Sequence, residues 1–121
     1  MSESGTLKAL AGTRMAIGAG AWATPRLAGR LFGLDAAGNP QSPYLARLFG
    51  ARDFALAWGV LGAEGSARRQ WLLAGLACDV ADAAAGIAGG RVGYLPRVTS
   101  VLVTATAVSA AVMGVAALRE A

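Results

Sequence analysis

Apolar residues follow one another along most of this chain in long runs that are broken only by scattered charges. Four of these runs approach the length of about 20 residues that a helix needs to cross the hydrocarbon of a bilayer. Backbone polar groups in hydrocarbon must be satisfied within the protein, so we expect each run to form a helix. The predicted spans are residues 7–23, 44–62, 70–89 and 98–118.

The last of these runs is the cleanest. Residues 98–118 carry no charge, and Arg119 follows them directly. The first half of the run is rich in β-branched residues, which favour strands in soluble proteins. The length of the uncharged run nevertheless favours a membrane-spanning helix.

A short amphipathic segment separates the first two spans. Thr24 is a suitable N-cap, and Pro25 suits the first helical position, so we predict a helix over residues 25–33. Its leucines share one face and its arginines another, each pair at a spacing of four: Leu27 and Leu31, Arg26 and Arg30. This pattern is typical of a helix that lies in the membrane surface.

Composition supports the same interpretation. Of the 121 residues, 55% are hydrophobic and only 15% are charged, whereas about a quarter of the residues in a soluble domain are charged. We therefore expect one domain, residues 1–121, that is a multi-pass protein of the cell membrane with the lipid bilayer as its partner. The predicted fold class is all-α: an integral membrane four-helix bundle with a short interfacial helix between its first and second spans.

Several classes of function are disfavoured by what the chain lacks. The net charge is +4, but the basic residues are scattered and not interleaved with aromatics, so we expect no nucleic-acid partner. Histidine is absent and Cys78 is the single cysteine. We therefore expect no metal site, no cofactor and no intramolecular disulfide.

Charged residues within the predicted spans are the most informative feature of the sequence. A charge in hydrocarbon costs at least ~2.5 kcal/mol, so each of these residues needs a partner or a function. At 1.5 Å per residue, five of them lie roughly 12–16 Å below the interface, which is near the midplane, and the sixth within about 5 Å of it. The five deep residues are Arg14, Arg52, Asp53, Asp79 and Asp82, and the shallow one is Arg47.

Helix geometry suggests how the deep residues meet. Asp79 and Asp82 are three residues apart and share a face, whereas the consecutive Arg52 and Asp53 diverge by about 100°. One plausible arrangement has Arg14 or Arg52 bridging the two aspartates of the third span, with Asp53 facing the other arginine.

The shallow arginine completes this arrangement. In it, Arg47 reaches Asp82 or the lipid headgroups. The formal charges of the six residues then balance, three arginines against three aspartates.

Three functions compete for this set of charges. The favoured one is a structural, accessory or ligand-binding membrane protein, in which ion pairs fix helix register and the protein assembles with itself or with another membrane protein. In the second, Asp79 and Asp82 share a proton and serve a proton-coupled small-molecule transporter. The third is an acid/base isomerase or cyclase acting on a lipophilic substrate, which requires a pocket of at least a few hundred Å³. For that enzyme the catalytic candidates are Asp79 and Asp82 as acids, Arg52 as anion stabiliser, and Asp53.

The order of these motifs resembles a known family. A glycine-rich first helix precedes Ala-Thr-Pro-Arg-Leu (23–27), Phe-Gly-Leu (32–34) and Arg-Leu-Phe-Gly-Ala-Arg-Asp (47–53), and the paired aspartates follow in the third span. This order looks like that of a family of small actinobacterial-type membrane proteins of unknown function with four predicted transmembrane helices. The resemblance implies a membrane location and a four-helix plan, and it implies no activity, ligand or catalytic residue.

Overall fold

The computed structural model describes residues 5–120, and their regular structure consists of helices alone. This part of the chain confirms the predicted all-α class. The helices are α1 (Gly5–Ala23), α2 (Pro25–Leu31), α3 (Ser42–Gly62), α4 (Gly65–Val92) and α5 (Arg97–Glu120). The four predicted spans lie within the four long helices, of which α4 extends furthest beyond its predicted limits.

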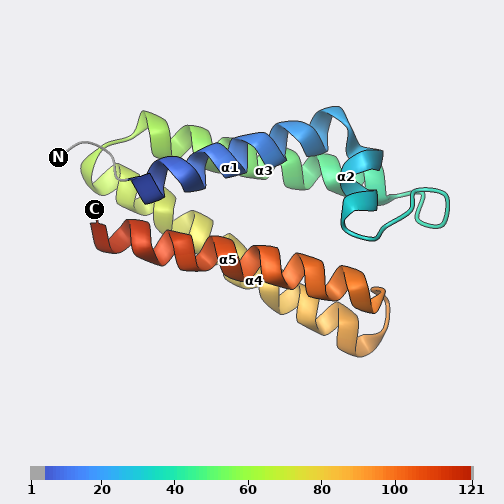
Figure 1. Cartoon of the computed structure of the whole chain (residues 1–121). Coiled ribbons are helices and arrows are strands. Elements are labelled where there is room, and N and C mark those ends of the chain that lie inside the picture. The colour runs from blue at the N-terminus through green and yellow to red at the C-terminus, as the bar shows by residue number, and fades with distance from the viewer. Residues whose placement is uncertain (1–4, 121) are drawn as a thin grey trace.

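The long helices associate as two antiparallel pairs, α1 with α3 and α4 with α5 (Figure 1). The two pairs lie closest at the end where α3 turns into α4, and they diverge toward the other end (Figure 1). Contacts of α3 with α4 and of α1 with α5 join the pairs less extensively. The Cα atoms of α1 and α4 stay more than 8 Å apart throughout.

A close backbone contact between two glycines holds the first pair together. A Cβ atom added to Gly18 of α1 would lie 2.6 Å from the carbonyl oxygen of Gly50 and 2.9 Å from the backbone nitrogen of Phe54, both in α3. Small residues of this kind let helices approach closely, which is a common means of packing helices in membranes. The α1–α3 interface therefore depends on glycine at these positions.

In the second pair, glycines of α4 pack closely against hydroxyl side chains of α5. Gly86 and Gly90 lie one turn apart on α4 and face Ser100 and Thr104 of α5. The Ser100 hydroxyl donates a hydrogen bond of 2.8 Å to the carbonyl oxygen of Gly86. Small residues and a bond between the helices thus fix the register of α4 against α5.

All four long helices contribute to an apolar core near the end of the molecule where α3 turns into α4. Its buried members are Leu7 and Leu10 of α1, Val60 of α3, Leu72 of α4 and Ala117 of α5. Each is at most 6% exposed. This core lies next to the deep charged residues predicted from the sequence, toward the end where the two helix pairs converge.

Helix α2 begins at Pro25, as predicted, and ends at Leu31. Thr24 does not cap it, because its hydroxyl donates a 2.7 Å hydrogen bond back to the carbonyl oxygen of Gly20 in α1. Beyond the helix, Gly33 has a φ of +84° and packs so closely on Thr99 of α5 that a side chain there would overlap it. The segment after α2 thus bridges the two helix pairs at their divergent end.

Two of the described helices, α4 and α5, are long and apolar enough to cross a membrane by length and composition. In their most apolar stretches, only 28% and 17% of the residues are buried inside the protein. Charges interrupt the apolar runs of α1 and α3, which do not reach the same apolarity. Membrane crossing by all four helices therefore stays a prediction.

Candidate functional site

Five of the six predicted charged residues form one connected network. Arg14 and Arg52 are the middle residues of α1 and α3, Asp53 follows Arg52, and Asp79 and Asp82 lie on α4. The chain of contacts runs Asp79–Arg14–Asp53–Arg52–Asp82. The predicted level of charge is therefore present halfway along the helices.

The buried half of the network is the pair Arg14–Asp79. Arg14 Nη1 donates to Asp79 Oδ1 at 3.1 Å, and Arg14 Nη2 donates to Asp79 Oδ2 at 2.5 Å. The two side chains are 6% and 4% exposed. Parallel hydrogen bonds between a guanidinium and a carboxylate are among the strongest pairings of side chains, so this pair links α1 firmly to α4.

The second half of the network repeats this geometry between α3 and α4. Arg52 donates to the two oxygens of Asp82 at 3.1 and 2.5 Å. Its guanidinium also lies 5.1 Å from the centroid of the Phe49 ring, within the range of a cation–π contact. Here the two side chains are 34% and 32% exposed, so this end of the network is accessible from outside the protein.

Asp53 is the residue that connects the two halves. Its Oδ1 accepts a hydrogen bond from Arg52 Nη2 at 3.3 Å and lies 3.8 Å from Arg14 Nη1. The arrangement expected from the sequence, in which one arginine bridges Asp79 and Asp82, is wrong. The two arginines reach α4 from different helices, so each binds its own aspartate, and the carboxylate that they share is Asp53.

Arg47 lies outside the network. Its Nε donates a 3.0 Å hydrogen bond to the carbonyl oxygen of Trp22, and its guanidinium lies 5.6 Å from the centroid of the Trp22 ring. A cation is favourable there because the last carbonyls of a helix lack partners within the helix. Of the two alternatives expected for Arg47, the contact with Asp82 is therefore absent, and the contact with lipid headgroups stays a prediction.

The position of Arg47 changes the charge balance of the site. Without it, the network contains two arginines and three aspartates, so its formal charge is −1 rather than zero.

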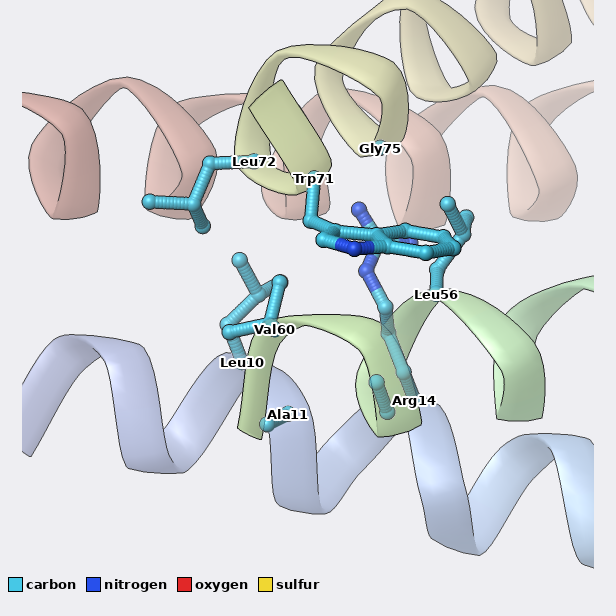
Figure 2. A pocket seen from close by; sticks show the side chains of 9 residues that line it. Leu10, Ala11, Arg14, Leu56, Val60, Trp71, Leu72 and Gly75 are labelled. Carbon is cyan, nitrogen blue, oxygen red and sulfur yellow. The ribbon is translucent and has the colours of Figure 1, made fainter. Parts of the chain in front are cut away.

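A glycine makes the buried pair possible, a role that could not be assigned to it from the sequence. Gly75 lies one turn before Asp79 on the same face of α4, and a Cβ atom added there would lie 2.9 Å from Arg14 Nη2. Figure 2 shows Arg14 extending from α1 toward Gly75. The signal available in the sequence is a glycine four residues before a buried aspartate.

The cavity beside Arg14 is small. Side chains of α1, α3 and α4 line it, among them Leu10, Leu56 and Trp71 (Figure 2), and its volume is about 10 Å³. That volume is at the lower limit for a single water molecule. The isomerase or cyclase hypothesis needs a far larger pocket at this place, so the geometry here does not favour it.

The chemistry of the site is confined to carboxylates and guanidiniums. Within residues 5–120, no group of three or more histidine, cysteine or acidic side chains is placed to hold a metal ion. Cys78 is a free thiol, partly buried, next to Asp79 in the sequence. The arrangement can pair charges and hold helices together.

No protein-family model, no curated protein and no solved structure matches this chain. The resemblance to the small four-helix membrane family therefore stays an expectation, and the role of the network rests on its geometry.

Proposed function

We propose that the chain is an integral membrane protein in which α1, α3, α4 and α5 all cross the bilayer, and that its Arg–Asp network is a structural link between two helix pairs. The surface of α4 and α5 supports the membrane location. Most of their apolar residues lie on the outside, whereas an apolar helix in a soluble protein is buried in the core. Lipid is the environment that suits such a surface.

The outer surfaces of α1 and α3 fit the same proposal. The network withdraws Arg14 and Asp53 from the surface, so that each is only 5% exposed. What remains outside includes large apolar side chains such as Trp22 of α1 and Leu45 and Trp58 of α3, at 53%, 59% and 68% exposure. At 1.5 Å per residue the two helices are about 28 and 31 Å long, close to the ~30 Å thickness of the hydrocarbon.

The observation that carries the structural role is the position of the two ion pairs between the helix pairs. Arg14–Asp79 and Arg52–Asp82 both end on α4, and their arginines come from α1 and α3. In lipid there is little hydrophobic driving force between helices, so packing and polar contacts decide which helices associate. The network thus specifies how the two pairs assemble into one unit, which can serve as a scaffold for itself or for another membrane protein.

A double-mutant cycle tests the structural role. Arg14→Met leaves the buried Asp79 carboxylate unpaired, and Asp79→Leu leaves Arg14 with only its 3.8 Å contact to Asp53, whereas the double variant removes both charges. We expect each single variant to lower the yield of folded protein in mild detergent and the double variant to restore it. Arg91→Met, which changes an exposed arginine outside the network, is the control and keeps the yield of the unmodified protein. Equal yields from all variants would contradict a structural role.

A second candidate function is a proton-coupled transporter. It is favoured by the formal charge of −1 and by the partial exposure of Arg52 and Asp82. Proton uptake into vesicles containing the purified protein tests it, with a trapped pH-sensitive dye as the probe. A transporter gives uptake above that of empty vesicles and loses it in a folded Asp82→Asn variant. Uptake equal to that of empty vesicles would exclude proton movement by this protein alone.

A further inference from the structure

An apolar groove of about 730 Å³ lies between α4 and α5, and none of the network residues is among those that line it. Its walls come from one face of each helix: Leu76, Val80 and Ala83 of α4, and residues between Val108 and Ala116 of α5. Several of these side chains are strongly exposed, for example Val112 at 63%. The groove is therefore a feature of the outer surface.

The groove extends from the level of the network to one end of α5. Val80 adjoins Asp79 in the sequence, and Arg119 and Glu120 border the groove at the other end. From Val108 to Arg119 the rise along α5 is about 16 Å, close to the ~15 Å of hydrocarbon in one leaflet. The groove thus has the length of one lipid leaflet.

A basic side chain stands at the interfacial end of this groove. Arg119 is exposed and has no ion-pair partner within residues 5–120. The neighbouring Glu120 accepts a 3.2 Å hydrogen bond from the Thr6 hydroxyl of α1. Seven residues before Leu76, the exposed Arg69 lies on the same face of α4 and adds a second positive charge near this end.

We propose that this groove binds one acyl chain of an anionic phospholipid, whose phosphate is held by Arg119. The inference rests on the proposed membrane location. An unpaired guanidinium at the interface suits a phosphate, which it can bind through two parallel hydrogen bonds. A second copy of the chain suits the groove less well, because a two-fold axis along the membrane normal would place the Arg119 side chains of both copies at the same depth.

Native mass spectrometry of the purified protein tests the proposal. The probes are a phosphatidylglycerol and a phosphatidylcholine with the same acyl chains. One arginine contact is worth a preference of about fivefold for the anionic lipid. We expect one phosphatidylglycerol per protein with at least that preference, and Arg119→Gln should lower the preference by about that factor.

Matched variants separate the phosphate contact from the groove itself. Ala83→Leu and Ala111→Phe fill the groove and should lower the binding of both lipids. Arg91→Gln, an exposed arginine on α4 at the opposite end of the molecule, should leave binding unchanged. Equal binding of the two lipids by the unmodified protein, or an unchanged preference in Arg119→Gln, would overturn the proposal. A dimer that the groove-filling variants dissociate would show a second copy there instead.

The experiment distinguishes failure of the lipid site from failure of the membrane location. If the protein fractionates with membranes but retains no lipid, the groove is not a lipid site and the location stands. If it is recovered in the aqueous fraction without detergent, the membrane location is wrong and the lipid site is wrong with it.

Discussion

Arg14 of α1 and Asp79 of α4 form a two-bond ion pair, although the Cα atoms of their helices never come within 8 Å of one another. The long arginine side chain spans the space between the two helix pairs, and Gly75 leaves room for its end. The α1–α4 relationship at this level is therefore set by two side chains and a glycine.

Replacing Arg14 by methionine should be strongly destabilising. The change leaves the carboxylate of Asp79 without its partner and removes one of the two arginines near Asp53. Breaking a buried ion pair in this way costs about 3–5 kcal/mol. Denaturant unfolding in mixed micelles measures the loss, and a cost below about 1 kcal/mol would show that the pair contributes little.

The two α4 aspartates should differ in their importance for stability. Asp79→Asn affects a side chain that is 4% exposed, whereas Asp82→Asn affects one that is 32% exposed. We expect a loss of several kcal/mol for the first variant and a smaller loss for the second, because the partly exposed Arg52 can move to other partners, whereas the buried Arg14 cannot. The same unfolding experiment compares the two, and equal losses would contradict the difference in burial.

The glycine contact between α1 and α3 predicts opposite effects for two alanine substitutions in α1. Gly18→Ala places a methyl group against backbone atoms of α3, whereas a Cβ atom at Gly20 meets nothing within 4 Å. We expect Gly18→Ala to cost about 1–3 kcal/mol and Gly20→Ala to stabilise by up to about 1 kcal/mol through helix propensity. Thermal unfolding followed by circular dichroism distinguishes the two, and a neutral Gly18→Ala would show that α1 and α3 can separate cheaply.

Gly75→Ala should destabilise the unmodified protein but stabilise a variant that lacks the Arg14–Asp79 pair. In the unmodified protein the added methyl group crowds the guanidinium of Arg14, which Asp79 holds in place, so we expect destabilisation. In the Arg14→Met/Asp79→Leu double variant the flexible methionine can move aside, and alanine should stabilise by about 1 kcal/mol. Unfolding midpoints of the four proteins measure the effect, and the same sign in both backgrounds would contradict it.

The helices were predictable from the long apolar runs. The layer of charged residues at mid-helix was predictable because charges within such runs conflict with their surroundings. Arg52 and Asp82 stand out on this ground without knowledge of the fold. The additional turns of α4 were not predicted, because Glu64, Gly65 and Ser66 together are typical of a turn, whereas the helix begins directly at Gly65.

The partners within the network were not predictable to the same degree. Which arginine binds which aspartate depends on the rotation of each helix and on the space between helices. Arg47 shows the difficulty, because its partner is a backbone carbonyl of Trp22, and sequence patterns do not reveal such a partner. The pairing of Gly18 with Gly50 likewise depends on the relative position of two helices far apart in the sequence.

The unequal division of the network between the helix pairs has a consequence for biogenesis. The first pair to be synthesised holds Arg14, Arg52 and Asp53, a formal charge of +1, and the second holds Asp79 and Asp82, a charge of −2. Neither hairpin is neutral in its interior on its own, and attraction between opposite charges is strong in a medium of low dielectric constant. The first helix pair to enter the membrane is therefore stabilised only when the second pair arrives and neutralises its charge. Two halves of the chain made separately would associate through the same charges.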